Sequence, residues 1–320
     1  MWCRKMEDPV EETIRSLQIS VDSEKARLEL DFEVRKFIDL LLLYPEALTV
    51  LFQWTRQPKP FIIVSPAEFN YAKLKSHMLD AVQETRYIRE FAYSLISQYS
   101  EAEDNARIVR INEFLGKASE AEMLDVKKEI ALLCFECGSI VVTNAIDKIG
   151  TCTCGSPFDV RFRIATISEK ISRTLTTGHL LELLALRIMR NVKQVKLIGM
   201  EFEKDGKENK VYTSIQYAGI GVGDKENGEL DVVGVKDDRI VAIECKFNET
   251  SHQDIDSFLG VSEKLYFKAR ERCPSIKKVV KVVFSYDGSK LKTANGFFVF
   301  SLKNLLSTDE LTRSISKILA

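Results

Sequence analysis

Long apolar runs, histidines and protease or kinase motifs are scarce or missing in this sequence, and each shortage excludes a class of protein. The apolar stretch 37–44 is too short for a membrane-spanning helix and contains Asp39. The basic residues near the N-terminus are not followed by an apolar segment, so a secretory signal is not expected. With three histidines in the whole chain, a histidine-based metal site lacks ligands. These shortages predict a cytoplasmic protein with no membrane partner.

The composition is that of a folded globular chain with room for two domains and a small third unit. The chain has 320 residues, of which 45% are hydrophobic and 29% are charged. The formal net charge is −1, but residues 160–320 carry 27 Lys and Arg against 21 Asp and Glu, while the remainder carries 19 against 26. A basic excess of this size is compatible with a nucleic-acid partner but does not indicate one by itself.

Residues 229–247 are predicted to form a β-hairpin. Two runs rich in Val and Ile flank a polar turn centred on Asp237 and Asp238. A two-residue turn at that point fixes the register of the two strands. Because side chains alternate between the faces of a strand, one face at the open end of the hairpin is predicted to carry Glu229, Asp231, Glu244 and Lys246.

This hairpin has two interpretations. Asp231 lies directly opposite Glu244 in the predicted register, and such a carboxylate pair suits Mg²⁺, which takes oxygen ligands and completes its shell with water and phosphate oxygens. The neighbouring Lys246 can polarise a water or stabilise charge on phosphorus. The alternative is a surface hairpin in which Glu229 and Lys246 form a cross-strand ion pair.

Four of the seven cysteines are spaced like zinc ligands. The two pairs are Cys134 with Cys137 and Cys152 with Cys154, each followed by glycine. Four thiolates around tetrahedral Zn²⁺ leave no position for water, so the predicted site is structural. The segment resembles a zinc ribbon, although its second pair is Cys-x-Cys rather than Cys-x-x-Cys. The alternative is four reduced, unligated thiols, and either reading favours a reducing compartment over a disulfide framework.

The order of predicted elements divides the chain into three parts. Residues 1–130 are expected to be mainly helical, with one strand at 61–64. Two capping boxes, at 65–68 and 119–122, each predict a helix, and the first of these helices is expected to extend to about residue 99. Residues 131–158 are expected to be a zinc-ribbon-like module, and 159–320 a mixed sheet flanked by helices. The predicted fold class is therefore α/β in the C-terminal part and α+β overall. The C-terminal elements are expected as helices at 177–191, 252–272 and 309–319 and strands at 196–203, 211–220, 279–286 and 296–302.

Glu182 stands out on the first of these C-terminal helices. It is surrounded in sequence by leucines, and a carboxylate on so apolar a helix is costly unless it is paired or coordinates a cation. The alternative is an exposed glutamate on the polar stripe of the helix, beside His179 and Arg187.

Asp231 followed by Glu244-Cys245-Lys246 after an apolar strand resembles the PD-(D/E)xK motif of restriction-endonuclease-like nucleases. The motif is most similar to that of CRISPR-associated effector nucleases and archaeal Mrr-like endonucleases, although Leu230 replaces the usual proline. The resemblance implies Mg²⁺ or Mn²⁺ held by Asp231, Glu244 and the backbone carbonyl of Cys245, with Lys246 activating water. It also implies that Glu182, in a G-x-x-L-E helix, supplies an additional acidic group.

The resemblance implies a nuclease that hydrolyses phosphodiester bonds, with DNA favoured over RNA. One alternative is a catalytically silent nuclease fold that binds nucleic acid; another is an effector-gated nuclease of the CRISPR or defence type. The N-terminal region is interpreted either as a recognition or homodimerisation module or as a helical scaffold, and its sequence does not show the strand–helix alternation of a nucleotide-sensing domain.

Overall fold

The structure, a computed structural model, describes residues 8–48, 50–51, 62–64, 98, 105–134, 136–137, 139–144, 150–176, 178–246, 252–285, 296–301 and 308–319. The protein is α+β, and it divides into two compact units. Met1–Ile38 and Thr176–Ala320 form the first, which we call the terminal unit because both ends of the chain belong to it. Asp39–Leu175 form the second, the middle unit. None of the described helices is long and apolar enough to cross a membrane.

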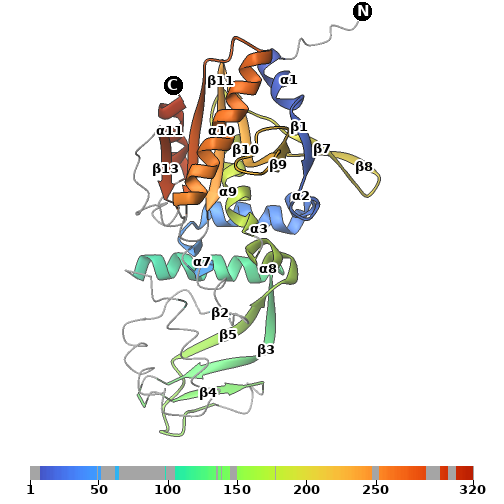
Figure 1. Ribbon diagram of the computed structural model, residues 1–320. Coiled ribbons are helices and arrows are strands. Elements are labelled where there is room, and N and C mark those ends of the chain that lie inside the picture. The colour runs from blue at the N-terminus through green and yellow to red at the C-terminus, as the bar shows by residue number, and fades with distance from the viewer. Residues whose placement is uncertain are drawn as a thin grey trace, which may run out of the picture. The chain divides into compact units, whose positions relative to one another are not determined.

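A mixed β-sheet forms the centre of the terminal unit (Figure 1). The strand order is β1-β9-β10-β11-β12-β13, and β6 pairs with β10 outside this path. Strands β11, β12 and β13 run parallel, while the pairs from β1 to β11 are antiparallel. The strands are β1 Gln18–Val21, β6 Lys196–Leu197, β9 Thr213–Tyr217, β10 Gly228–Lys236, β11 Arg239–Lys246, β12 Lys278–Ser285 and β13 Phe297–Ser301, with a separate ribbon of β7 Met200–Lys204 and β8 Lys207–Val211.

Helices cover this sheet and supply the rest of the core. α10 makes the crossover between the parallel strands β11 and β12, and its Phe258 and Leu265 belong to the same buried core cluster as Val233 and Val235 of β10. α9 is buried along most of its length and contacts β9, β10, β11 and β12. The helices are α1 Pro9–Arg15, α2 Ser23–Leu30, α9 His179–Arg190, α10 His252–Arg272 and α11 Thr308–Leu319. α3 Phe32–Leu43 begins in this unit, and its residues from Asp39 onward belong to the middle unit.

The hairpin of β10 and β11 has the predicted register. Val232 pairs with Ile243, and Lys236 pairs with Arg239 across the turn. Asp237, in that turn, has a φ of 52°, a left-handed conformation that Asp tolerates in tight hairpins. The strands predicted at 279–286 and 296–302 are present as β12 and β13, because apolar runs suit a parallel sheet. The single strand predicted at 196–203 is wrong: β6 ends at Leu197, and β7 begins at Met200 in a separate ribbon with β8. The strand predicted at 211–220 is present as Thr213–Tyr217, since β8 ends at Val211.

The middle unit has a smaller antiparallel sheet of order β2-β5-β3-β4. Its strands are β2 Ile62–Val64, β3 Leu124–Leu133, β4 Ile140–Thr143 and β5 Val160–Ile167, and its helices are α7 Asn105–Glu120 and α8 Glu169–Thr176. The strand predicted at 61–64 is confirmed for Ile62–Val64. The helix predicted at about 66–99 lies outside the described residues, apart from Gln98.

The helix predicted after the capping box at 119–122 is wrong. α7 ends at Glu120, Glu122 takes a left-handed φ of 57°, and the chain continues as strand β3. The apolar residues of this segment fit a helical spacing, but Ile130 to Leu133 form a continuous run buried on both faces, as in a central strand. Pairing with β4 and β5 decides between the two periodicities.

The compact units differ from the predicted boundaries at 130 and 158. The first 38 residues belong with the C-terminal part, because β1 pairs with β9 at the edge of the larger sheet. The cysteine segment shares its sheet with β5 and so belongs to the middle unit. Both differences come from pairings between strands distant in sequence.

Candidate functional site

The candidate site lies at the end of the β10–β11 hairpin, where the predicted Asp231, Glu244 and Lys246 are found together. The Asp231 side chain is 8% exposed, and its Oδ2 accepts a hydrogen bond of 2.6 Å from the backbone N–H of Cys245. Lys246 Nζ lies 2.6 Å from Glu244 Oε1. The hairpin therefore holds one carboxylate by its backbone and pairs the other with an ammonium.

Asp231 is an electrostatically unfavourable place for a negative charge. Burial raises the pKa of Asp231 well above its ordinary value, and the neighbouring carboxylates of Glu244 and Glu182 raise it further. The Cys245 N–H and Lys25 act in the opposite direction but do not compensate. Burial likewise raises the pKa of Glu244, although Lys246 partly offsets the effect.

Glu182 is brought to this site from α9. It is 4% exposed, so the alternative of a solvent-exposed glutamate is wrong. Its carboxylate accepts a hydrogen bond of 2.9 Å from His179 Nδ1 and one of 2.5 Å from the Ser214 hydroxyl. Burial would raise the pKa of Glu182, but its contacts with His179 and Lys25 lower it to about 2. Gly178, with a φ of 72°, begins the helix in a conformation that glycine accepts without strain.

Lys25 of α2 lies among these carboxylates and was not predicted as a site residue. Its Nζ is 2.7 Å from Glu182 Oε1, 2.9 Å from Ser214 Oγ and 3.7 Å from Glu229 Oε1. Burial acts to lower the pKa of Lys25, but Glu182 first, and then Asp231 and Glu229, raise it. An ammonium that belongs to the chain thus neutralises part of the acidic cluster.

Two strands and a helix cap hold Lys25 and Ser214 in place. Asp22 caps α2 by accepting from the backbone N–H groups of Glu24 and Lys25, each at 2.9 Å. Ser214 lies in β9 between the pairs that β9 forms with β10, and its left-handed φ of 51° marks a local irregularity of the strand. On β10, the residue between the two pairs that flank Ser214 is Asp231.

The ion pair considered between Glu229 and Lys246 is not formed. Lys246 pairs with Glu244, while Glu229 lies opposite Gln216 of β9 and its carboxylate faces Lys25. β10 is a central strand that pairs with β9 as well as with β11. The position of Glu229 therefore depends on β9, which the hairpin sequence alone does not reveal. The alternative of an isolated surface hairpin therefore fails.

The four cysteines of the middle unit converge as their spacing predicts. Cys134 Sγ is 3.7 Å from Cys154 Sγ, and Cys137 Sγ is 3.4 Å from Cys152 Sγ. All four sulfurs lie within 4.8 Å of one another. Sulfurs bound to one tetrahedral Zn²⁺ at about 2.3 Å would be about 3.8 Å apart. Among the residues that the structure describes, this is the one group of three or more Cys, His, Asp or Glu ligands gathered so closely.

The local backbone favours thiolate at two of these cysteines. Backbone N–H groups, that of Cys154 first, lower the pKa of Cys152 to about 6. The pKa of Cys154 is lowered by the backbone and side chain of Ser156. For Cys134, backbone N–H groups lower the pKa, but burial and the neighbouring thiols outweigh them and raise it to about 11. The four close cysteines can hold a structural zinc ion.

Comparison with known proteins adds little beyond the geometry. No protein-family model matches the chain, and no curated protein matches it. Among solved structures, the crystal structure of protein VC1899 from Vibrio cholerae is similar at 12% identity with a TM-score of 0.31. The match covers 98% of this chain and 57% of that one, so the chain spans little more than half the length of its structural neighbour.

Proposed function

We propose that the terminal unit is a nuclease that uses a divalent cation, Mg²⁺ or Mn²⁺, to hydrolyse phosphodiester bonds, with DNA as the favoured substrate. The observation that carries the proposal is the gathering of Asp231, Glu244 and Glu182 with Lys246 at one end of the hairpin, from three different elements. Two buried carboxylates with raised pKa values, beside a third that stays ionised, are the electrostatic environment that a cation relieves.

The donor set fits a hard cation, and each residue has a distinct role in the proposal. Asp231 and Glu244 would hold the ion, together with the carbonyl oxygen of Cys245, while Glu182 would supply a further carboxylate oxygen. A cation bound there would acidify a coordinated water and offset charge on the phosphate. Lys246, which Glu244 orients, would hold the attacking water and stabilise the charge that develops on phosphorus.

A cleavage assay tests this function directly. Labelled single- and double-stranded DNA and RNA should be incubated with the full chain in Mg²⁺, Mn²⁺ or EDTA. Metal-dependent cleavage of at least one substrate is expected, with no cleavage in EDTA. The second candidate, a nucleic-acid-binding scaffold, is favoured by the Lys25 ammonium that already neutralises the cluster. It would replace the nuclease proposal if no substrate is cleaved, with or without candidate effectors, while Asp231→Ala binds nucleic acid as wild type does.

Lys25 makes a prediction that separates the two candidates. If a divalent cation binds beside Glu182, Lys25→Met should raise Mn²⁺ affinity about tenfold, because it removes an ammonium worth about 1.4 kcal/mol of competition. In EDTA the same variant should melt at a lower temperature than wild type, since Glu182 loses a buried partner. Adding Mn²⁺ should restore the melting temperature.

Calorimetry and thermal melts measure both effects, and Lys317→Met, at an exposed position of α11, is the matched control. Metal affinity that stays unchanged or falls in Lys25→Met would show that no cation competes with Lys25 for these carboxylates.

We further propose that the middle unit carries one structural Zn²⁺ on Cys134, Cys137, Cys152 and Cys154. Protein purified without chelator should contain about one zinc ion per chain by elemental analysis. Cys152→Ser should lose most of it, because the thiolate whose pKa is most lowered is removed. Cys273→Ser, a buried cysteine of the terminal unit, should keep full zinc content. Zinc-free wild-type protein would contradict the proposal.

A further inference from the structure

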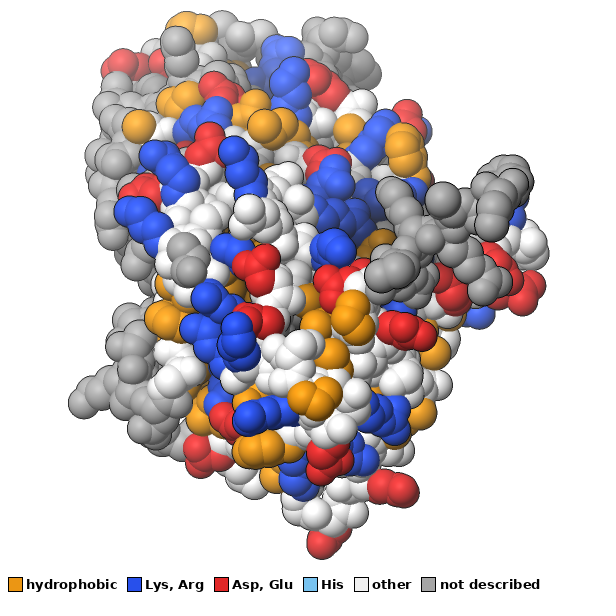
Figure 2. Space-filling view, turned by 90° about the horizontal axis from the view of Figure 1, so that it is seen from above, with side chains coloured by type: hydrophobic (Ala, Val, Ile, Leu, Met, Phe, Trp, Pro, Cys, Tyr) orange, Lys and Arg blue, Asp and Glu red, His pale blue; other side chains and the backbone are white. Residues whose placement is uncertain are grey.

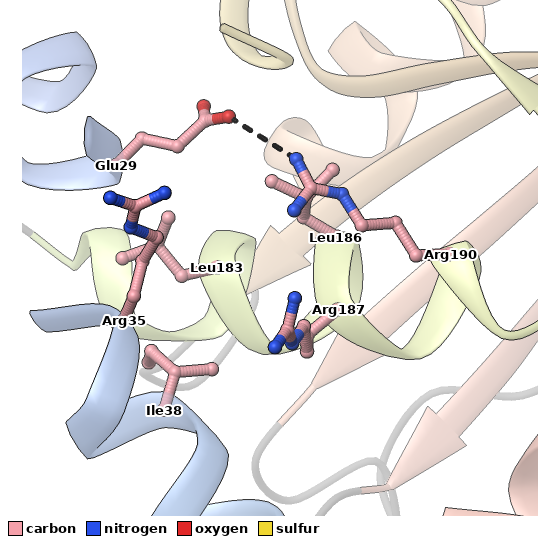
Figure 3. A pocket seen from close by; sticks show the side chains of 7 residues that line it. All are labelled: Glu29, Arg35, Ile38, Leu183, Leu186, Arg187 and Arg190. Atoms are coloured by element: carbon pink, nitrogen blue, oxygen red, sulfur yellow. Dashed lines mark ion pairs between the residues drawn. The ribbon is translucent and has the colours of Figure 1, made fainter. Parts of the chain in front are cut away.

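A pocket of the terminal unit lies beside the candidate site and is lined by arginines. The pocket has about 330 Å³ of empty space, including its open mouth, and is formed by α2, α3 and α9. Leu183 and Leu186 of α9 form an apolar part of its wall, and Arg35, Arg187 and Arg190 line it (Figure 3).

One acidic residue, Glu29, lines the same pocket, but its carboxylate already accepts several hydrogen bonds. It is 5% exposed, and its carboxylate accepts from the backbone N–H of Tyr212 at 3.0 Å and from Thr213 N–H at 3.1 Å. The Thr213 hydroxyl donates a third bond of 2.8 Å. Arg190 Nη2 is 3.9 Å from Glu29, an ion pair rather than a close hydrogen bond. Arg190 is therefore paired at long range with a carboxylate that already has three other donors.

Two of these arginines, Arg190 and Arg35, are placed to receive an anion. Arg190 also lies over the Tyr212 ring, 5.1 Å from its centroid, which restrains the guanidinium at the pocket edge. Arg35 Nη2 donates to the carbonyl of Leu30 at 3.3 Å, a weak contact that leaves its other N–H groups available. Guanidinium forks match the oxygens of phosphate better than ammonium groups do.

The pocket is one helical turn from the candidate site on two elements at once. α2 carries Lys25 toward the carboxylates and Glu29 into the pocket, four residues apart. α9 carries Glu182 toward the site and Leu186 into the pocket at the same spacing. One turn of helix is about 5.4 Å. In β9, Thr213 contacts Glu29 and the next residue, Ser214, contacts Glu182.

We infer that this arginine pocket binds a phosphate group of a nucleic-acid strand next to the phosphate held at the acidic cluster. The choice of a polynucleotide as the source of the phosphate rests on the proposed nuclease function; the phosphate-binding chemistry itself does not. On the face seen from above, basic side chains are interspersed with acidic ones (Figure 2). In this inference the arginine pocket, rather than a broad positively charged surface, contacts the phosphate and so positions the strand.

The test measures binding without catalysis. A fluorescein-labelled 20-nucleotide single strand is titrated with full-length protein in EDTA, comparing wild type, Arg35→Gln/Arg190→Gln and the control Lys193→Gln, which removes an exposed charge just beyond α9. The double variant should bind about tenfold more weakly. The slope of log affinity against log salt should fall by about 0.7, the value for one lost phosphate contact on a single strand. The control should lose less than twofold.

A second arm identifies the source of the phosphate and does not depend on cleavage. A nucleoside 5′-monophosphate is titrated into wild type, the double variant and the Lys193→Gln control by calorimetry. If the double variant loses only the monophosphate and binds the strand as the control does, the pocket serves a free nucleotide and the inference of a strand site is overturned. If neither ligand distinguishes the double variant from the control, the pocket binds no phosphate. Weakened strand binding with no nuclease activity in wild type would support this pocket while rejecting the proposed function.

Discussion

Replacing Asp231 by Asn is expected to abolish cleavage and, at the same time, to raise the thermal stability of the metal-free protein. Burial and two neighbouring carboxylates make the Asp231 charge unfavourable, as its raised pKa shows. Asn keeps an oxygen that accepts from the Cys245 N–H and removes the charge. A gain of about 1 kcal/mol corresponds to about 2–4 °C in Tm for 150–250 residues. Loss of a metal ligand removes turnover, so stability and activity should change in opposite directions.

The pH dependence of this difference has a defined sign. A carboxyl whose folded pKa is raised favours folding in its protonated form, so the penalty is absent below about pH 3.9, the unfolded value, and develops as pH rises through the folded pKa. The Tm of Asp231→Asn should therefore exceed that of wild type by most at neutral pH in EDTA, and the gap should close on acidification. Excess Mg²⁺ should also close it, because only wild type gains from binding the ion.

Asp237→Asn provides the matched control for both measurements. Asp237 is exposed in the turn of the same hairpin, and Asn accepts its left-handed φ of 52° as well as Asp does. This control should cleave and melt like wild type. If Asp231→Asn lowers the Tm and still cleaves, the buried carboxylate is a structural group and the assignment of the site to this hairpin is wrong.

The parts of the site that follow from local sequence rules could be predicted. The turn at Asp237 sets the register of β10 and β11, and the register brings Asp231 to the level of Glu244. The cysteine pairs converge because each pair lies in a turn of its own, a local feature. The burial of Glu182 follows from the leucines around it, since one face of so apolar a helix cannot remain exposed. These features depend on residues within one element or one turn.

The parts that depend on distant pairings could not be predicted. Lys25 reaches the acidic cluster because β1 joins the sheet beside β9, and nothing in residues 18–25 indicates that partner. The position of Glu229, opposite Gln216, likewise depends on β9. Residues 124–133 satisfy both a helical and a strand period, and the sheet of the middle unit decides between them. A lysine near the N-terminus could have been suspected only by asking what would neutralise a buried Glu182.

Lys246→Ala should differ from Asp231→Asn in that it keeps the metal and loses the rate. It leaves the carboxylates of Asp231 and Glu244 in place, and it removes the ammonium that now lies 2.6 Å from Glu244. Mg²⁺ affinity should therefore hold or rise slightly, because a competing positive charge is gone. Loss of one group that stabilises charge in the transition state typically costs about 10²–10³ in rate. Cleavage should fall by that factor at saturating metal.

Calorimetry with Mg²⁺ or Mn²⁺ and single-turnover cleavage, run on both variants, measure this difference. Lys278→Ala, on the exposed side of neighbouring β12, should leave both properties unchanged. Lys246→Arg retains the charge but cannot release a proton near neutral pH. If Lys246 only stabilises charge, the arginine variant should recover much of the rate; if Lys246 also takes a proton from water, it should remain as slow as Lys246→Ala. Wild-type rates in Lys246→Ala, with metal bound, would remove Lys246 from the chemistry and leave it as the ion-pair partner of Glu244 alone.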